Sequence, residues 1–431
     1  MTMFDAIDFF TDPSLVDDPF PYFDHLRAQC PAQPLPHHGV VGVTGYDAAT
    51  EVWRDPATYS ACISVTGPFP GLPPRPDGVA IDDHIARHRA ELPLGDYLAT
   101  QDPPTHTALR GLLMRLLTPK RLKENERFMR RLVDRQLDAV VPAGRFEVLQ
   151  GFAKPYALLV IADLLGVPEQ DHQEFRKQLG AEQLGPGVGV EQRQSLDPLG
   201  FLFDTFSAYV EDRRRDPRDD VLTQLATATY PDGAVPEVAD VVRTATFLFA
   251  AGQDTTARLI TVAVQLIGED PALQATLRAE RDRIPDFLEE VLRLEGPVKT
   301  VSRLARADTT LAGTPVAGGT TVCIFPHAAN RDPAHFDEPD RLRLDRPNAR
   351  EHLAFGRGIH SCPGGPLARI EARIALERLL DRALDIRISE DHHGPAHDRR
   401  YEQDPTYVLR GLRALHIDIT PEAPEDHPAP S

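Results

Sequence analysis

Residues 355–369 read Phe-Gly-Arg-Gly-Ile-His-Ser-Cys-Pro-Gly-Gly-Pro-Leu-Ala-Arg, which places a single cysteine, Cys362, on a glycine-rich loop ahead of a predicted helix. The glycines allow the backbone to approach a flat ligand closely and to adopt conformations that other residues avoid. Pro366 suits the first turn of the helix. The partial positive charge of a helix N-terminus favours a thiolate over a thiol. The loop is therefore suited to present a thiolate sulfur.

A lone cysteine leaves two interpretations open, because the commonest fate of a free cysteine is burial as a small apolar residue. The order of Phe, Gly, His, Cys and Arg around it decides between them. This segment resembles the haem-binding loop of the cytochrome P450 family, the haem-thiolate monooxygenases, in its soluble bacterial form. The resemblance implies haem b as cofactor and Cys362 as the axial iron ligand, which favours O–O cleavage. It also assigns to the haem site Phe355, Gly356, Gly364 and His360.

A second motif lies in the middle of a long predicted helix, where residues 250–256 read Ala-Ala-Gly-Gln-Asp-Thr-Thr. Helical spacing places Phe247, Ala251 and Thr255 on one face, with Asp254 beside them. Small residues leave room for a diatomic ligand, and a threonine hydroxyl can distort the helix. In isolation the stretch could be an ordinary helix. The resemblance implies that Thr255 hydrogen-bonds dioxygen and that Asp254 relays protons to it, so we expect both to be catalytic.

The two haem propionates need cationic or hydrogen-bonding partners. The family's matching positions are His106, Arg110, Arg303 and His360. His106 and Arg110 are four residues apart, hence on one helical face. For each of these two residues in isolation, a solvated surface position would be the ordinary alternative.

The predicted substrate pocket is lined by Phe247, Ala251 and Thr255 and, by family analogy, by Val298 and Val301. These side chains, with Phe69, favour an apolar or aromatic substrate. Residues 67–78 and 184–189 are irregular in composition and are predicted to form a moving entrance. Lys299 and several arginines are candidate anchors for a substrate carboxylate, although no spacing supports the assignment.

One further cluster is predicted to be structural. Glu290 and Arg293 are three apart on a helix and can pair. The resemblance to the family implies that they belong to a buried Glu-Arg-Arg cluster, and we expect Arg341 to be its third member.

The net charge of −18 over 431 residues argues against a nucleic-acid partner. The acidic N-terminal segment, interrupted by Pro13, is typical of neither a signal peptide nor a membrane anchor. The longest apolar stretch is interrupted by Asp254 and Arg258, which indicates a buried helix. We therefore expect a monomeric cytoplasmic protein without a membrane segment. Widely spaced cysteines at 30, 62 and 323 indicate packing residues, with neither a zinc site nor disulfides.

Most of the chain has helical periodicity, with a long central helix over residues 236–267 that begins at Pro236 and ends at Gly268. Strand patterns occur near residues 40–43, across 309–325 and near the C-terminus. We predict a single α+β domain over residues 1–431, mainly α-helical, with the cytochrome P450 fold. Its long helix would lie over the haem beside small β-sheets, and residues 420–431 would form a disordered tail.

No flavin or dinucleotide fingerprint is present, so electrons are expected from a partner. A basic run indicates a ferredoxin dock steered by opposite charge, with solvated helix charge as the alternative. It comprises Arg110, Arg115, Lys120, Arg121 and Lys123, with Arg357 nearby.

The predicted function is a monooxygenase that activates O2 with electrons from a ferredoxin and its NAD(P)H-dependent reductase. It would hydroxylate, epoxidise or O-dealkylate a small apolar organic substrate. A peroxide-driven peroxygenase is the first alternative, and it is disfavoured because Asp254 and Thr255 are both present. A non-enzymatic haem or ligand-binding protein is the second, and it would have no use for such a pair.

Pro363 directly follows the ligand and lacks an N–H group. N–H groups that point at the sulfur withdraw charge from it and raise the iron potential. Pro363 removes one such donor and leaves Gly364 and Gly365, so we expect a lower potential than leucine would give at this position.

Overall fold

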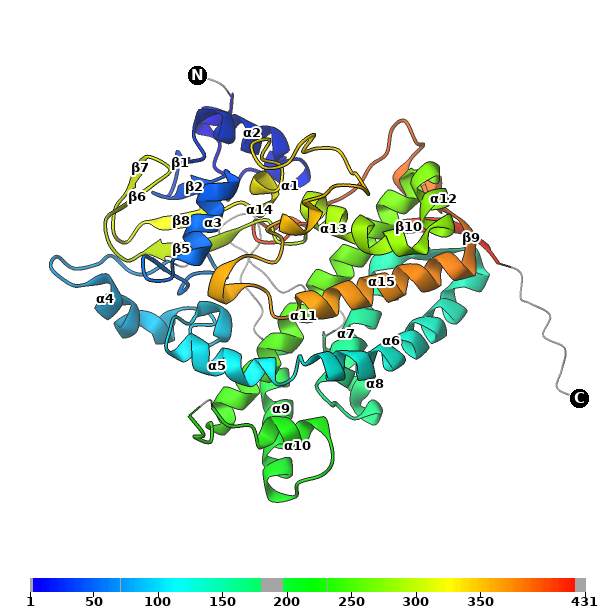
Figure 1. Ribbon diagram of the computed structural model, residues 1–431, viewed down its shortest axis with the longest axis horizontal. Helices are drawn as coiled ribbons and strands as arrows, with labels where there is room; N and C mark the ends of the chain where they lie inside the picture. The colour runs from blue at the N-terminus through cyan, green and yellow to red at the C-terminus, as the bar shows by residue number, and fades with distance from the viewer. Residues whose placement is uncertain (1–2, 70, 180–196, 231, 423–431) are drawn as a thin grey trace, which may run out of the picture.

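The long helix α11 (Val238–Glu269) crosses the middle of the molecule, and the other helices pack around it (Figure 1). The computed structural model describes residues 3–69, 71–179, 197–230 and 232–422. The remaining α-helices are α1 (Ser14–Asp17), α2 (Phe20–Gln29), α3 (Tyr46–Arg54), α4 (Ile81–His88), α5 (Thr105–Met114), α6 (Pro119–Val140), α7 (Lys154–Leu164), α8 (His172–Leu179), α9 (Asp197–Arg215), α10 (Val221–Ala226), α12 (Pro271–Ala279), α13 (Ile284–Glu295), α14 (Pro326–Ala329), α15 (Gly365–Arg382) and α16 (Glu390–His393).

The strands form three small sheets. Their bounds are β1 (Ala32–Pro34), β2 (Val41–Val43), β3 (Tyr59–Ser60), β4 (Arg145–Glu147), β5 (Val301–Ala305), β6 (Thr309–Leu311), β7 (Thr314–Val316), β8 (Thr321–Ile324), β9 (Ala383–Ile388) and β10 (His416–Pro421). The largest sheet has the order β1-β2-β8-β5-β3, the second β4-β10-β9, and β6 pairs with β7 alone. Among the strands of the described residues, only the β2–β8 pair is parallel. The predicted α+β fold with small sheets is confirmed.

The early strands differ from the prediction, which placed strand pattern near residues 40–43 and otherwise only late in the chain. β1, β3 and β4 contain two or three residues each, too few for a period-2 pattern to stand out. β3 pairs with β5 and β4 with β10, both distant in sequence, whereas β1 pairs with the nearby β2. β3 and β4 therefore depend on tertiary pairing rather than on local sequence.

Both ends of α11 differ from the predicted residues 236–267. Pro236 precedes the N-cap Glu237 instead of lying in the first turn. At the other end the helix continues through Gly268, where a Cβ atom would lie 2.9 Å from Ile388 Cδ1 of β9. Gly268 is therefore needed for close packing against the sheet rather than as a helix terminator.

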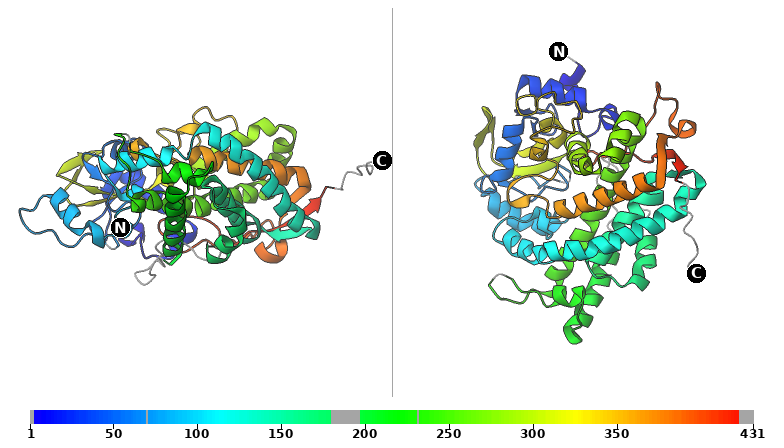
Figure 2. Two further views of the ribbon diagram at one scale, coloured as in Figure 1. Left: turned by 90° about the horizontal axis from the view of Figure 1, so that it is seen from below. Right: turned by 45° about the vertical axis from the view of Figure 1, so that its right-hand side comes forward.

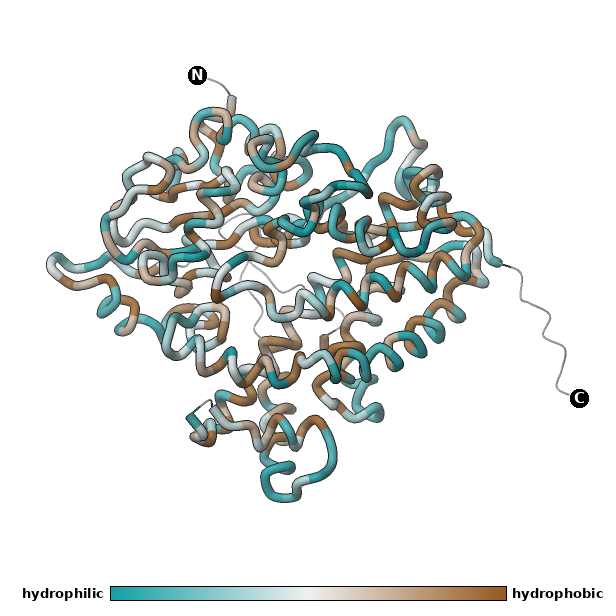
Figure 3. The backbone as a smooth tube through the Cα atoms, viewed as in Figure 1, coloured by the Kyte–Doolittle hydropathy of each residue, from teal (hydrophilic) through white to brown (hydrophobic). Residues whose placement is uncertain are grey.

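The main hydrophobic core surrounds α11 and includes residues of α5, α6, α7, α9, α13 and α15, with a second core between α3 and the five-stranded sheet. Figures 1 and 2 show α15 lying alongside α6, and these helices are in contact. Hydrophilic and hydrophobic turns alternate along α6 (Figure 3), as expected for a helix with one face against the core. In the part of the chain that the structure describes, no helix is both long and apolar enough to span a membrane.

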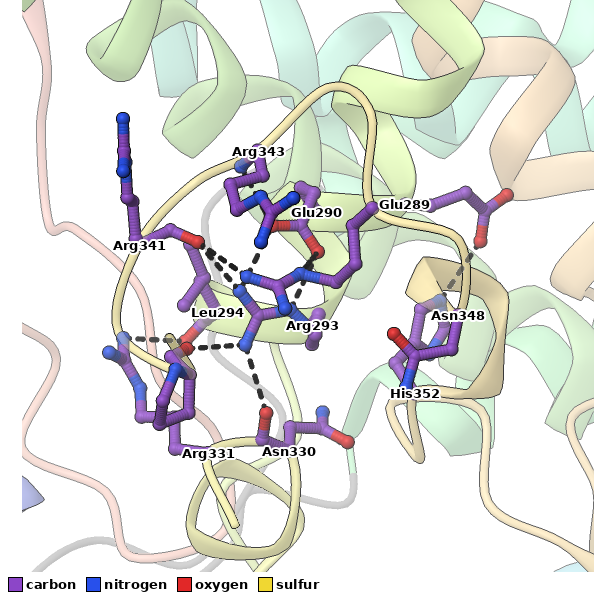
Figure 4. A network of polar contacts seen from close by, with 12 residues as sticks. Glu289, Glu290, Arg293, Leu294, Asn330, Arg331, Arg341, Arg343, Asn348 and His352 are labelled. Carbon is purple, nitrogen blue, oxygen red and sulfur yellow. Dashed lines mark hydrogen bonds and ion pairs between the residues drawn. The ribbon is translucent and has the colours of Figure 1, made fainter. Parts of the chain in front are cut away.

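The predicted Glu-Arg-Arg cluster exists, but its third member is Arg346. Arg293 and Arg346 donate to Glu290 Oε1 at 2.6 and 3.0 Å, and all three side chains are buried. The Arg341 side chain is 69% exposed and points out of the network (Figure 4), where it pairs with Glu338. Only the carbonyl of Arg341 joins the cluster, as acceptor for both buried arginines. Spacing alone could not distinguish arginines five residues apart in an irregular segment.

The predicted tail begins later than residue 420, because Thr420 and Pro421 belong to β10. Residues 423–431 and the connector 184–189 lie outside the described residues. Cys62 and Cys323 are buried, as expected of packing residues, and Cys30 is half-buried.

Candidate active site

The Cys362 loop lies between α3 and the start of α15. Gly356 and Gly358 both have a left-handed backbone, with φ of 63° and 69°. A Cβ atom at 358 would collide with the carbonyl oxygen of Trp53, and one at 356 would lie 3.9 Å from the Trp53 ring. Gly356 is not part of the cavity wall, whereas Gly364 is. Gly356, predicted to approach a flat ligand, instead lets the loop turn and pack on α3.

Cys362 lines an interior cavity, into which its exposed surface opens. Burial raises the pKa of its thiol, although the N–H groups of Gly364 and Gly365 act in the opposite direction, as does the charge of Arg110. The N–H groups at the start of α15 thus favour the thiolate, as expected, while burial opposes it. Coordination to a metal ion deprotonates a thiol outright.

Four donors gather at one end of this cavity: His106 and Arg110 from α5, Arg303 from β5, and His360. The His106 and His360 rings lie 4.1 Å apart between centroids. Burial is the main cause that lowers the pKa of His106 to about 4 and that of His360 to about 2, so both imidazoles are neutral near pH 7. The predicted propionate partners thus come together from three separate segments.

These donors are poorly supplied with acceptors. Within the described part of the chain, both ring nitrogens of His106 and Nε2 of His360 are buried without a hydrogen-bond partner. Among the described residues neither Arg110 nor Arg303 has a carboxylate within ion-pair distance; Arg303 donates to the Ser302 carbonyl at 2.8 Å and Arg110 weakly to Ser361 at 3.5 Å. Buried polar groups are normally paired. A planar haem, with two carboxylates at one edge and a metal facing Cys362, fits this set of residues.

The middle of α11 forms another part of the same cavity wall. Thr255 Oγ1 donates to the Ala251 carbonyl at 2.9 Å, so the hydroxyl hydrogen-bonds within its own helix, as the sequence predicts. Asp254 is buried and is held by two cations. Arg258 Nε donates to Asp254 Oδ2 at 2.7 Å, and Lys154 Nζ lies 3.6 Å from Oδ1.

The sequence-based site did not include Arg258, Lys154 or Asp404, whose carboxylate lies 2.5 Å from Arg258 Nη2. The spacing of Asp254 and Arg258, four residues apart, is a sequence signal for their pair. Lys154 and Asp404 are distant in sequence and carried no such signal.

The five predicted pocket residues, Phe247, Ala251, Thr255, Val298 and Val301, all line the cavity, whose volume is about 400 Å³. The wall also includes side chains that the sequence did not indicate: Val65, Leu94, Tyr97, Leu98, Leu199, Leu248, Val408 and Leu409. The Tyr97 ring lies 6.3 Å from that of Phe247.

Two expectations about the pocket are wrong. Among the described residues of the 67–78 loop, none lines the cavity; Phe69 packs against Phe10 and His38 in a separate core near the N-terminus. Lys299 does not face the cavity, because its Nζ points to the Leu15 carbonyl at 3.5 Å. The proline-rich composition of residues 67–78 did not correctly predict whether they line the cavity. Nor did the position of Lys299 next to Val298 show where its side chain points.

The basic run divides into exposed side chains and side chains that are committed to backbone carbonyls. Arg115, Lys120 and Lys123 are exposed. Arg121 donates to the Leu164 carbonyl at 2.7 Å and Arg357 to the Glu351 carbonyl at 2.6 Å. Both guanidinium groups thus hold neighbouring segments in place, which leaves a smaller basic surface than the sequence suggested.

Residues 143–384, more than half of the chain, match the family model for Cytochrome P450. The chain belongs to this family of haem-thiolate monooxygenases, as the Cys362 loop indicated.

Several relatives share nearly the full length. Cytochrome P450 CYP150A6 from Mycobacterium marinum, solved in the substrate-free form, is 57% identical with a TM-score of 0.92, over 97% of this chain and all of the other. PikC, a cytochrome P450 monooxygenase from Streptomyces venezuelae, is 33% identical over 93% of this chain and 91% of its own length. CYP109E1 from Bacillus megaterium, solved with testosterone, is 28% identical with a TM-score of 0.77, over 93% of this chain and 99% of the other.

Proposed function

We propose that this single-domain chain is a haem b monooxygenase that receives electrons from a ferredoxin and its NAD(P)H-dependent reductase and oxidises a small, apolar, uncharged substrate. One observation carries the proposal: Cys362, the unpartnered donors and the Asp254-Thr255 pair all line one cavity whose remaining wall is apolar. When bound, the haem supplies a thiolate-ligated iron at which dioxygen is activated.

The protein's part in holding the cofactor is divided among named groups. Cys362 Sγ binds the iron. The guanidinium groups of Arg110 and Arg303 and the N–H groups of His106 and His360 bind the propionates as charged and neutral donors. Phe355 and Gly364 also line the cavity and would lie beside the cofactor.

Asp254 and Thr255 supply protons in this proposal. The Thr255 hydroxyl hydrogen-bonds to the Ala251 carbonyl and keeps a lone pair on Oγ1 that can accept a further hydrogen bond inside the cavity. Asp254 carries the proton between solvent and this hydroxyl, which requires its carboxylate to leave Arg258 at least transiently.

The chemistry of the wall favours an uncharged substrate. The ionisable residues among the described wall residues are Cys362, Tyr97, Asp254 and the four donors at the cofactor end. Ser64 and Thr300 already donate to the Ala99 and Tyr407 carbonyls, at 2.7 and 2.9 Å. No hydrogen bond is present at the Tyr97 hydroxyl within the described part of the chain, so it remains available to a substrate carbonyl or hydroxyl. CYP109E1 has been solved with testosterone and with corticosterone, both uncharged and largely apolar, which supports the same class here.

The ferredoxin would dock where Arg115, Lys120 and Lys123 are exposed, next to the helix that carries Arg110. A positive surface on a chain of net charge −18 would steer an acidic iron–sulfur protein to this face. Monomeric state and cytoplasmic localisation stay predictions from the sequence.

Titration of the ferric enzyme with a compound library tests the substrate class, because a ligand that displaces iron-bound water shifts the visible spectrum. We expect steroids and other neutral polycyclic compounds to shift it and fatty acids of equal size to fail. Compounds that bind should then be oxidised with ferredoxin, reductase and NAD(P)H. Preferential binding of carboxylic acids, or turnover with peroxide alone, would contradict the proposal.

A further inference from the structure

Two carboxylates share one buried guanidinium between α11 and the C-terminal loop. Arg258 donates from Nε to Asp254 Oδ2 at 2.7 Å, and its Nη2 lies 2.5 Å from Asp404 Oδ2. The side chains of Arg258 and Asp404 are 3% and 1% exposed. Buried charges are stable only when they are paired. Arg258 therefore satisfies both acids at once, one on the long helix and one on the loop.

The charges of this group are balanced by a second cation. Burial works against the charge of Arg258, but the carboxylates of Asp254 and Asp404 outweigh it and raise the pKa of the guanidinium. Lys154, from the first turn of α7, lies 3.6 Å from the other oxygen of Asp254. Asp254 is thus held at both carboxylate oxygens. Arg258, which makes the shorter of the two contacts, also pairs with Asp404.

Asp404 starts a short loop whose middle lines the cavity. The Asp404 N–H donates to the Gly411 carbonyl at 2.9 Å and closes residues 404–411 into a compact turn. Val408 and Leu409, in the middle of this loop, belong to the cavity wall. The Val408 carbonyl accepts from the Lys299 N–H at 2.8 Å, which fixes the loop next to the predicted pocket residue Val298. One segment therefore contacts both the cavity and Arg258.

The end of the loop lies directly on the Arg258 side chain. A Cβ atom at Gly411 would be 2.6 Å from Arg258 Nη1 and 2.9 Å from its Cγ, closer than any ordinary contact. Glycine at this position allows the loop backbone to approach the guanidinium. A small movement of the loop must therefore move Arg258 as well.

We propose that Arg258 is a positioning residue that couples Asp254 to the loop 404–411, so that occupancy of the cavity controls how firmly the proton-carrying acid is held. The inference rests on the proposed function, in which Asp254 delivers protons. A molecule that packs on Val408 and Leu409 shifts the loop, and Arg258 moves with Asp404, to which it is paired, and with Gly411, against which it packs. The contact of Arg258 with Asp254 then loosens, and Asp254 is released toward the cavity.

The Asp404→Asn holoenzyme tests this coupling, with ferredoxin, reductase and the compound that gives the largest spectral shift. Arg258 then pairs with Asp254 alone and holds it more firmly. We expect kcat to fall about threefold to tenfold and its solvent isotope effect in D2O to rise, while the dissociation constant of the compound stays within about twofold. Asp404→Glu should restore both. Hydrogen exchange along residues 254–258 should respond to the compound in the wild type and not in Asp404→Asn.

Asp220→Asn is the control, because Asp220 and Asp212 also share one buried arginine, Arg213, at a more exposed position away from the cavity wall. It should leave kcat and the isotope effect unchanged. In an Asp254→Asn background, Asp404→Asn should have no further effect on either quantity.

The coupling is overturned if Asp404→Asn keeps the wild-type kcat and isotope effect, or if its effect persists without the Asp254 carboxylate. Wild-type turnover by Asp254→Asn alone would instead show that the proposed role of Asp254 is wrong. Should Asp404→Asn fail to fold, Gly411→Ala serves the same purpose, since it displaces Arg258 without changing any charge. We expect Gly411→Ala to alter the solvent isotope effect when Asp254 is present and to leave it unchanged in the Asp254→Asn background.

Discussion

The imidazole rings of His106 and His360 lie 4.1 Å apart, in the cavity that Cys362 also lines, and both are neutral near pH 7. A neutral imidazole has one N–H to donate. Among the residues that the structure describes, neither Nε2 atom has a hydrogen-bond partner. The two rings are therefore arranged as neutral donors beside the guanidinium groups of Arg110 and Arg303.

His106→Phe should weaken haem retention, because a hydrogen bond to a propionate is lost. A hydrogen bond to a charged group contributes about 1.5–3 kcal/mol, which corresponds to haem loss about tenfold to a hundredfold faster. Transfer of haem to an excess of apomyoglobin measures this rate. His327→Phe is the control, since His327 is equally buried but lies outside the cavity wall. Equal rates for the two variants would show that His106 does not contact the cofactor.

Pro363→Leu should raise the iron potential. The N–H groups of Gly364 and Gly365 already interact with the Cys362 sulfur, and leucine adds a third. One hydrogen bond of about 0.5–1.5 kcal/mol corresponds to roughly 20–60 mV for a one-electron couple. Spectroelectrochemical titration measures the shift. Pro366→Ala, at the first turn of α15, adds an N–H beyond the two glycines whose N–H groups interact with the sulfur, and it should change little. An unchanged or lower potential in Pro363→Leu would refute the expectation.

Thr255→Ala should still consume NAD(P)H but release hydrogen peroxide in place of product, because the hydroxyl in the cavity is lost. We expect the ratio of product to NAD(P)H to fall about tenfold or more, within the usual contribution of a proton-transfer group. Thr261→Ala is a close control: its hydroxyl donates to the Ala257 carbonyl at 2.8 Å on the same helix, outside the cavity wall. The assignment fails if both variants remain fully coupled.

The sequence predicted this site well where the motifs are local. Cys362, Asp254 and Thr255 lie in short segments whose composition constrains the backbone, and the structure places all three at one cavity. It failed where long-range packing decides. Arg346 rather than Arg341 enters the Glu290 cluster, and Gly356 contacts Trp53 rather than the cavity. Asp404 reaches Arg258 from a loop that is distant in sequence, and no local pattern could show this.

Acid should destabilise the protein in part through Glu289. Burial by itself would raise the pKa of this carboxyl, but hydrogen bonds from His352 and Arg369 lower it to about 2. Because the folded-state pKa lies below the ordinary value of 4.5, the stabilisation is complete above that pH and is lost as the pH falls toward 2. It amounts to roughly 3 kcal/mol at pH 7.

Glu289→Gln should therefore lower stability at pH 7 and flatten its dependence between about pH 5 and pH 2. Urea unfolding at several pH values measures both effects. The half-exposed Glu338 provides the control, and Glu338→Gln should change neither. A pH dependence in Glu289→Gln as steep as that of the wild type would assign the acid sensitivity to other groups.

Isotope labelling under 18O2 tests the central claim most directly. The purified enzyme, with ferredoxin, reductase and NAD(P)H, is supplied with the neutral compound that gives the largest spectral shift. A monooxygenase inserts one oxygen atom of O2 into the product and reduces the other to water, so the product should carry one 18O and consume one equivalent of NAD(P)H. An unlabelled product, formed instead from hydrogen peroxide without ferredoxin, would contradict the account.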